Sequence, residues 1–405
     1  MKKRIFISIQ YLEIGGAERS LIGLLNAIDY SKFDVDLFVY RHTGEFMKLI
    51  PPQVRLLPEN KRYRAISLPI SQIVRQGNID IAIARLLARI PTRLFERRTG
   101  ASESIALFQY IANYTTPLLP SLKKYGEYDL AISFLIPHNI VRDKVRAKRK
   151  WAWIHTDYSF VEMDVANELP VWDAYDHIVS ISADVTKAFL GKFPSLENKI
   201  IQVENILSES FVRQQADEGI DAVEHEISAL CCATGESDVV RLCSVGRFSY
   251  PKAFDRAAHI CKILVNKGIH VLWYIVGYGG EESLIRQAIA ETGMMKHFVL
   301  VGKKENPYPY IKACDIYVQP SRYEGNAVTV REAQILGKPC VITSYATAHS
   351  QIKDGVDGVI VPNDVEAAAD GIVSFIQNKT LQSDIMTYLS QHHYGNEEEA
   401  RKLEE

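Results

Sequence analysis

The sequence predicts an α/β protein built from two doubly wound domains, and three observations lead to this prediction. The chain opens with an apolar strand, a glycine loop, an amphipathic helix and a second strand, at Arg4–Gln10, Gly15-Gly16, Ala17–Ile28 and Val35–Tyr40. This order is typical of a doubly wound domain. The same alternation of strands and helices restarts after Val239. The 405 residues are 47% hydrophobic, which suffices for two cores.

The first domain is expected to cover residues 1–205. Its further strands are predicted at Val54–Leu57, Asp129–Phe134, Trp151–Ile154, His177–Ile181 and Ile200–Val203. A basic helical insertion at about 61–128 interrupts the alternation. Residues 206–238 are predicted to form a linker, because they include the acidic and weakly patterned stretch Gln214–Glu226.

The second domain is expected to cover residues 239–380, and residues 381–405 are predicted to form a C-terminal helix. The sequence leaves open whether this helix crosses back to the first domain. The strands of the second domain are predicted at Val240–Val245, His270–Val276, Phe298–Val301, Asp315–Gln319, Pro339–Ile342 and Gly358–Val361. The two domains are expected to face a central cleft, where open α/β sheets bind their ligands.

Composition narrows the class of protein. The net charge of −2 gives no global signal for nucleic acid binding. The six cysteines contain no C-x-x-C pair and no Cys/His ligand spacing, so no zinc site is expected and the cysteines are read as reduced core residues. The start, MKKRIFISIQ, is broken by Ser8 and Gln10, so it is read as a strand rather than a signal peptide. No run reaches 18 apolar residues, and we expect a cytoplasmic protein.

The most informative stretch runs from Pro320 to Pro339, PSRYEGNAVTVREAQILGKP, and lies between two predicted strands. A helix is predicted over Ala327–Leu336. Glu324 and Glu332 are eight residues apart, about 12 Å on helical rise. Paired acid/base carboxylates lie roughly 5–9.5 Å apart, so this spacing instead suits hydroxyl groups at the two ends of one ligand, such as a nucleoside diphosphosugar.

Free backbone amides at Asn326, Ala327 and Val328 are expected to meet phosphate or sugar oxygens at the start of this helix. With its EG start and GKP end, the stretch resembles the E-x7-E signature of the retaining glycosyltransferases of family 4, a large group with the GT-B fold. The resemblance is strongest over Val240–Val361 and fair over Ile5–Ile28 and Trp151–Ile181. It is absent over 41–128, where such enzymes carry acceptor-binding elements.

The resemblance implies a GT-B fold and transfer, with retention of configuration, from a UDP- or GDP-linked sugar to a glycan or lipid-linked acceptor. It implies that Glu332 holds the ribose and that Glu324 holds sugar hydroxyls. Gly246-Arg247-Phe-Ser-Tyr-Pro-Lys252 resembles the family's G-R-x(4)-K segment, whose two cations neutralise the diphosphate. The family usually has glycine or asparagine after the lysine, and Ala253 departs from that pattern.

Further segments resemble the family at lower specificity. Gly15-Gly16-Ala-Glu-Arg matches the G-G-A-E-R variant, and W-I-H-T-D implies that His155 contacts the donor sugar. We therefore predict catalytic roles for Arg247, Lys252, Glu324 and His155. Donor-binding roles are predicted for Gly15, Gly16, Gly246, Gly277, Gly302, Lys303, Asn326, Ala327, Val328 and Glu332.

No metal or separate cofactor is predicted. Two pairs of aspartates resemble a D-x-D metal motif, Asp34/Asp36 and the wider pair Asp354/Asp357. Asp34 and Asp36 precede the apolar run Leu37–Tyr40 and so lie at the wrong end of a strand. They are read as strand-edge residues.

The insertion carries an excess of cations. Between Lys61 and Arg98 only Asp80 and Glu96 oppose Arg62, Arg64, Arg75, Arg85, Arg89, Arg93 and Arg97. Two interpretations stand equally: helices with one solvated face, or a patch that lies on an anionic membrane. A second cluster, Arg142–Lys150, adds to the latter.

The resemblance implies a metal-independent hexosyl- or related glycosyltransferase in surface polysaccharide or capsule assembly. The two interpretations of the basic segment leave open whether it is peripheral to the inner face of the plasma membrane. Alternatives are a non-catalytic GT-B partner subunit, a sugar-nucleotide epimerase and, with less support, an NAD-dependent oxidoreductase. The last would need a G-x-G-x-x-G fingerprint, which the glycine pair does not supply.

Overall fold

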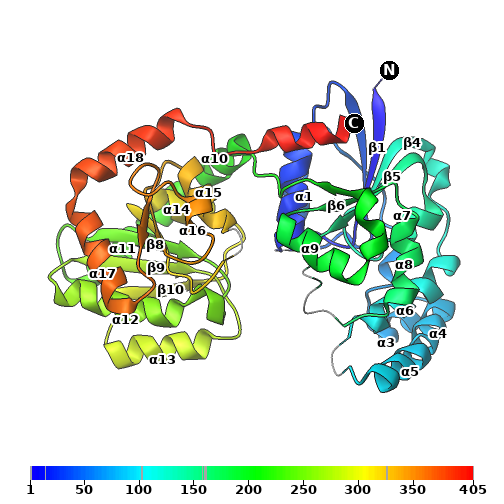
Figure 1. Ribbon diagram of the computed structural model, residues 1–405, viewed down its shortest axis with the longest axis horizontal. Helices are drawn as coiled ribbons and strands as arrows, with labels where there is room; N and C mark the ends of the chain where they lie inside the picture. The colour runs from blue at the N-terminus through cyan, green and yellow to red at the C-terminus, as the bar shows by residue number, and fades with distance from the viewer. Residues whose placement is uncertain are drawn as a thin grey trace. The chain divides into compact units, whose positions relative to one another are not determined.

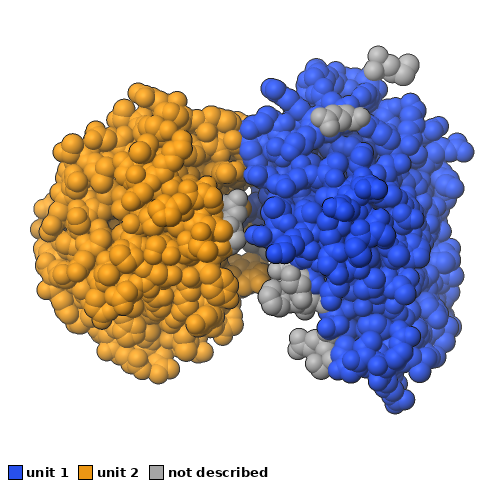
Figure 2. Space-filling model, in the orientation of Figure 1, with its two compact units in different colours: residues 1–206, 396–405 blue, residues 207–395 orange. Residues whose placement is uncertain are grey.

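The computed structural model describes residues 2–13, 15–101, 104–156, 158, 162–324 and 327–404. The chain divides into two compact units, which Figure 2 distinguishes by colour. Unit 1 contains residues 1–206 and 396–405, and unit 2 contains residues 207–395.

Unit 1 is built on a parallel sheet with the strand order β3-β2-β1-β4-β5-β6-β7. The strands are β1 (Lys3–Ile9), β2 (Phe33–Val39), β3 (Arg55–Leu56), β4 (Glu127–Ser133), β5 (Arg146–Ile154), β6 (His177–Ser180) and β7 (Ile200–Gln202). Each overlaps a predicted apolar run, because strands covered by helices on both faces read as continuous hydrophobic stretches. β5 is longer than predicted, since it begins in the basic stretch at Arg146, five residues before Trp151. β1 lies between β2 and β4, with Ile5 opposite both Val35 and Leu130, so the strand order reverses there.

Helices cover this sheet and fill the predicted insertion. They are α1 (Gly16–Ala27), α2 (Lys61–Arg64), α3 (Ile70–Arg75), α4 (Ile79–Leu87), α5 (Arg89–Thr99), α6 (Ala106–Thr115), α7 (Asn139–Lys144), α8 (Val165–Asp173) and α9 (Ala183–Lys192). Short 3-10 segments are η1 (Glu45–Leu49), η2 (Thr116–Leu118), η3 (Lys123–Tyr125) and η5 (Pro194–Lys199). In Figure 1, α3 to α6 gather at one end of unit 1.

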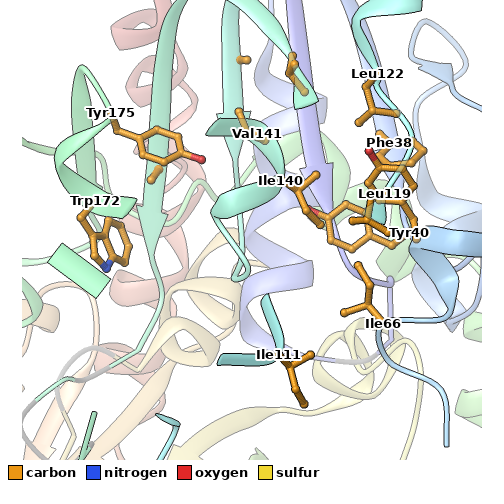
Figure 3. Packing of buried hydrophobic residues seen from close by; sticks show 14 of the residues in the cluster. Phe38, Tyr40, Ile66, Ile111, Leu119, Leu122, Ile140, Val141, Trp172 and Tyr175 are labelled. Atoms are coloured by element: carbon orange, nitrogen blue, oxygen red, sulfur yellow. The ribbon is translucent and has the colours of Figure 1, made fainter. Parts of the chain in front are cut away.

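One aromatic-rich cluster ties the insertion to the sheet (Figure 3). Tyr63 from α2 packs edge-on against Phe38 of β2, with ring centroids 4.9 Å apart. Tyr40 and Leu119 belong to the same buried cluster. Burying side chains of this size contributes about 1.5–3 kcal/mol each, so the insertion is an integral part of unit 1.

Unit 2 repeats the arrangement with the strand order β10-β9-β8-β11-β12-β13. Its strands are β8 (Val240–Val245), β9 (Val271–Val276), β10 (Phe298–Gly302), β11 (Ile316–Gln319), β12 (Cys340–Thr343) and β13 (Val359–Val361). The helices are α10 (Glu209–Asp217), α11 (Ile220–Thr234), α12 (Phe254–Asn266), α13 (Glu282–Thr292), α14 (Tyr308–Ala313), α15 (Val328–Ile335), α16 (Ala348–Gln351), α17 (Val365–Gln377) and α18 (Lys379–Gln391), with the 3-10 segment η6 (Tyr250–Lys252).

Two separate buried clusters show that both faces of this sheet are covered (Figure 1). One contains residues of α12, α13 and α17, and the other contains residues of α10, α11, α14 and α15. The segment 206–238, predicted as a linker, therefore has a different structure. It forms α10 and α11, whose Val212 and Ile227 are fully buried.

The C-terminal segment divides where one helix was expected. α18 ends at Gln391, and the 3-10 segment η7 (Glu397–Glu404) belongs to unit 1. Lys32 pairs with Glu404 at 2.8 Å, and the amide of Glu204 donates to Glu399 at 3.0 Å. Among the described residues, no helix is both long and apolar enough to cross a bilayer.

The reading of Asp36 as a strand-edge residue is wrong. Asp36 lies inside β2, and its side chain is only 7% exposed, whereas that of Asp34 is 64% exposed. Arg4 and the Tyr128 hydroxyl donate to Asp36 Oδ2 at 3.2 and 2.6 Å, and Arg55 Nε donates to Oδ1 at 2.6 Å. Asp36 therefore joins β1, β3 and β4 to β2 through charged hydrogen bonds.

We predict that Asp36→Asn lowers the free energy of unfolding by about 2–3 kcal/mol, because hydrogen bonds to a charged group contribute about that much and two arginines lose their counter-charge. Asp34→Asn, two residues away on the same strand, is the matched control and changes stability by less than about 0.5 kcal/mol. Urea denaturation of both variants measures the difference. Equal losses would show that Asp36 does not have this role.

Candidate functional site

The candidate site in unit 2 lies at the carboxyl ends of β8 and β11. β8 is flanked by β9 on one side and by β11 on the other, so the chain reverses its direction of winding between β8 and β11. In open α/β sheets, ligands bind outside the strand ends at this switch point. The loops that follow the two strands carry the G-R-x(4)-K segment and the first part of the E-x7-E stretch.

The two loops meet in an ion pair between Lys252 and Glu324. Lys252 Nζ lies 2.6 Å from Glu324 Oε1, and the side chains are 20% and 10% exposed. Ser321 Oγ and Gln319 Nε2 donate to the same oxygen at 2.6 and 3.2 Å. Low exposure and three donors fix the carboxylate in one orientation. The structure thus brings together two residues for which the sequence predicted separate roles.

Arg322 and Asp255, neither of which was selected from the sequence, hold the same two loops together. The guanidinium donates to both carboxylate oxygens of Asp255, at 3.0 and 2.6 Å, and the Arg322 amide donates to the carbonyl of Pro251 at 2.7 Å. Burial acts to raise the pKa of Asp255, but the hydrogen bonds and charge of Arg322 outweigh it and the pKa is lowered. A bidentate pair of this kind fixes geometry as well as adding stability.

Gly277 is needed for close packing between the loops after β8 and β9. A Cβ atom on Gly277 would lie 1.9 Å from the carbonyl oxygen of Gly246. Around Gly246 itself, an added Cβ would lie 3.3 Å from the aliphatic carbons of Lys252. Both glycines therefore position the lysine loop through backbone packing.

Ala253 occupies a left-handed conformation, with φ 55° and ψ 34°, as the N-cap of α12. This conformation costs a non-glycine residue about 1–2 kcal/mol, which gives a physical reason for glycine or asparagine at this position in the family that the segment resembles.

Arg247 is exposed, and in the part of the chain that the structure describes no ion pair or side-chain hydrogen bond involves its guanidinium. Gly302 ends β10 with φ +86°, and Lys303 Nζ lies 5.2 Å from the centre of the Tyr278 ring. Ala327 is buried and Val328 is the first residue of α15. Asn326 lies outside the described residues.

Glu332 is fully buried in α15, and the Tyr308 hydroxyl donates to its Oε1 at 2.9 Å. Tyr308 in turn packs edge-on against Phe211 of α10, with ring centroids 6.4 Å apart. The second glutamate of the E-x7-E stretch is therefore held inside the unit by Tyr308 of α14, and α10, from the segment predicted as a linker, packs against that tyrosine.

Unit 1 has its own switch point between β1 and β4, where the loop after β1 carries Gly15 and Gly16. A Cβ on Gly15 would lie 2.1 Å from Glu18 Oε2, while nothing lies within 4 Å of one on Gly16. Glu18 is only 7% exposed, and burial raises its pKa. This buried carboxylate was missed from the sequence, although its place in the first helical turn after the glycine pair was the available signal.

His155 lies at the end of β5 with its ring centroid 4.6 Å from that of Phe134. Burial lowers its pKa to about 3, so the imidazole is neutral near neutral pH. Its Nε2 is buried and has no hydrogen-bond partner among the described residues. His138, close by, is also neutral near neutral pH, because burial lowers its pKa to about 3. Its Nδ1 lies 2.8 Å from Ser133 Oγ. His155 is therefore suited to hydrogen-bond a polar ligand as a neutral imidazole, and not to carry a positive charge.

Two doubly wound units, each with predicted site residues at its switch point, define the GT-B class of fold. Solved structures confirm this fold. A glycosyltransferase from Rickettsia africae is 14% identical with a TM-score of 0.65, and the match covers 99% of this chain and 97% of that one. Anabaena HepE, solved in complex with UDP-glucose, is 15% identical with a TM-score of 0.60, covering 99% and 98%.

The sequence comparisons concern the second unit. Residues 235–392 match the family model described as "Glycosyl transferases group 1". The amylovoran biosynthesis glycosyltransferase AmsK of Erwinia amylovora is 31% identical over 32% of this chain and 34% of its own length. The capsular polysaccharide biosynthesis glycosyltransferase CapM of Staphylococcus aureus is 27% identical over 35% of this chain and 38% of its own length. The matched segment spans only about a third of each of these relatives.

We predict that Gly277→Ala destabilises unit 2 by about 1–3 kcal/mol, because the new methyl group overlaps the Gly246 carbonyl and forces the lysine loop to shift. Gly280→Ala is the matched control, since nothing lies within 4 Å of a Cβ there. Thermal unfolding of the two variants tests the packing. A Gly277→Ala protein as stable as Gly280→Ala would contradict it.

Proposed function

We propose that this protein is a glycosyltransferase that moves a hexosyl or related sugar from a nucleoside diphosphosugar to a glycan or lipid-linked glycan, with retention of configuration and without a metal. The observation that carries the proposal is the Lys252–Glu324 pair at the switch point of unit 2, inside the segment that matches the group 1 model. A cation and an oriented carboxylate in one place offer contacts to a diphosphate and to sugar hydroxyls.

In this proposal Arg247 and Lys252 meet the diphosphate. Cleavage of the sugar–phosphate bond develops negative charge on the leaving group, and fixed cations that strengthen their contacts in the transition state lower the barrier. Arg247 is exposed and thus accessible to phosphate oxygens. Lys252 is held by Glu324, whose Oε1 also accepts from Ser321, so the carboxylate stays oriented when the ammonium turns toward phosphate.

The other predicted residues are assigned to the remaining parts of the donor. Glu324 holds sugar hydroxyls, and His155 hydrogen-bonds the donor sugar in its neutral form. The amides at the start of α15, at Ala327 and Val328, face phosphate or sugar oxygens. Glu332 holds the ribose, which requires the Tyr308 hydroxyl to share or yield Oε1. Gly302 and Lys303 lie on the base side.

The biological setting is proposed from the names of relatives. AmsK and CapM belong to amylovoran and capsular polysaccharide biosynthesis. A relative from Escherichia coli, 27% identical over 22% of this chain and 24% of its own length, is a galactosyltransferase that uses UDP-Gal and an α-D-GlcNAc-diphosphoundecaprenol. We therefore propose surface polysaccharide assembly on a lipid-linked acceptor at the inner membrane face, and UDP-sugars are the first donors to test.

Arg247→Ala and Lys252→Ala are each predicted to lower kcat by about 10²–10³-fold, the usual loss for one transition-state donor, with a smaller loss of donor affinity. Activity should be unchanged in excess EDTA. Release of free nucleotide from UDP- and GDP-sugars, measured with the glycan acceptor, checks both statements. Lys296→Ala, at an exposed cation away from the two loops, is the control.

Four outcomes would contradict this mechanism. Activity that vanishes with EDTA and returns with Mn²⁺ would replace the cation mechanism with a metal-assisted one. A loss confined to KM would leave Arg247 and Lys252 as binding residues only. Donor binding without any turnover would favour a non-catalytic partner subunit, and epimerised donor would favour an epimerase.

Glu332→Gln is predicted to weaken binding of the nucleoside diphosphate by about 1.5–3 kcal/mol, the range for hydrogen bonds to a charged group. Glutamine keeps the shape of the buried side chain, so the variant separates ribose binding from a packing defect. Titration calorimetry gives the affinity, and Tyr308→Phe, which retains the carboxylate, is the control with a smaller loss. Unchanged affinity in Glu332→Gln would exclude the ribose role.

A further inference from the structure

The outer face of α4 and α5 carries a continuous apolar stripe. Ile83, Leu86, Ile90 and Leu94 follow one another at intervals of three or four residues, so they lie along one side of the two helices. Their exposed fractions are 52%, 46%, 58% and 61%. Ile79 and Leu87 beside them are also exposed. Six large aliphatic side chains on two short, consecutive helices form a gathered surface rather than scattered singles.

The core does not need this stripe. The opposite face of the same helices supplies the buried residues, including Ile81, Ala84, Ala88 and Phe95. α4 and α5 pack through that face on α6, at the end of unit 1 shown in Figure 1. A surface helix of a globular protein normally turns a polar face outward. Here the helices are apolar on the inside and apolar again along the outer stripe.

A stripe of arginines runs beside the apolar one. Arg89, Arg93 and Arg97 recur at intervals of four residues. Arg89 and Arg93 each directly precede an aliphatic residue of the outer stripe, and Arg97 lies near the end of that stripe. All three are exposed, and among the described residues none takes part in an ion pair, whereas Arg62 and Arg64 nearby pair with Asp80 and Glu59.

Acidic residues on these two helices do not balance the arginines. Over residues 79–99 there are five arginines and two acids. Asp80 is engaged by Arg62, and Glu96 accepts a hydrogen bond from Ser104 at 3.1 Å. The outer surface of α4 and α5 is therefore apolar and cationic at once.

We propose that this α4–α5 surface docks on an anionic lipid bilayer. Aliphatic side chains at this spacing enter the boundary between headgroups and acyl chains, while long arginine side chains reach the phosphates beside them. Each arginine near such a surface adds about fivefold to the partition coefficient at low salt. Charge complementarity identifies the partner: over residues 79–99 the surface offers five arginines against two acids, and a bilayer offers anions together with an apolar phase.

The second basic cluster predicted from the sequence, Arg142–Lys150, does not extend this surface. Arg142 pairs with Asp143, and Lys148 pairs with Asp129. Lys150 donates from Nζ to the carbonyl of Arg142 at 2.6 Å, and burial lowers its pKa. These cations have partners within β4, β5 and α7, so only α4 and α5 carry the proposal.

The inference does not depend on the donor chemistry proposed above, because docking is measured without a nucleotide sugar. The full-length protein is co-sedimented with vesicles of phosphatidylcholine alone or mixed with phosphatidylglycerol, at low and high salt. We expect binding to the anionic vesicles only, falling steeply as salt screens the arginines.

Two pairs of substitutions make the test specific. Arg93→Gln with Arg97→Gln should lower the partition coefficient about 25-fold, since each arginine accounts for about fivefold. Ile90→Ser with Leu94→Ser should lower it at least about tenfold and leave a salt-sensitive remainder. Met295→Ser with Lys296→Glu, an exposed apolar and cationic pair in unit 2, is the matched control and should bind as the unmodified protein does.

The proposal is overturned if anionic vesicles do not bind the unmodified protein at low salt, or if both α4–α5 double variants bind as well as the control. Self-association that Leu94→Ser abolishes, without vesicle binding, would assign the surface to a second copy of the chain and also overturn it. An unchanged midpoint of thermal unfolding in every variant shows that the proteins are folded. Because this control uses no nucleotide sugar, a failure of docking stays distinct from a failure of the proposed activity.

Discussion

The ion pair between Lys252 and Glu324 is the contact on which the arrangement of the candidate site depends. The residues are 72 positions apart, yet they meet at 2.6 Å because β8 and β11 are neighbours in a parallel sheet and their following loops leave the same edge. Arg322 and Asp255 clamp the loops a second time, and Gly277 removes the side chain that would otherwise push the β8 loop away. Each of these contacts positions the cation and the carboxylate.

This contact also sets the chemistry that the site favours. Lys252 has its charge balanced by Glu324, while Arg247 is exposed on the same loop. In the function proposed above, the diphosphate of the donor meets the accessible guanidinium of Arg247 and the ammonium of Lys252, while Ser321 and Gln319 still donate to Glu324. In that proposal the two cations stabilise the leaving group more than the ground state, because its negative charge grows as the bond breaks.

Unit 1 has the corresponding order of strands in its sheet, but different residues lie at its strand ends. Its glycine loop lies over the buried carboxylate of Glu18, and its neutral His155 ends β5. Asp36 holds its sheet together through two arginines and a tyrosine. Its insertion adds α4 and α5, which pack inward through Phe95 and leave Leu94 and Arg93 exposed. Unit 2 thus carries the residues proposed to bind the diphosphate, and unit 1 carries His155 and the surface proposed to dock on the membrane.

The sequence by itself determined the fold class and every strand named above, because parallel strands covered on both faces read as apolar runs bounded by turns. It also determined which loops carry charge, since Lys252 and Glu324 follow strand ends. Only the tertiary structure decided that these two residues meet, that Asp36 is buried, that α10 and α11 fill the expected linker, and that Ala253 is in a left-handed conformation. The physical reason is the same in each case: strand order and packing bring distant residues together, and local periodicity carries no record of which strands become neighbours.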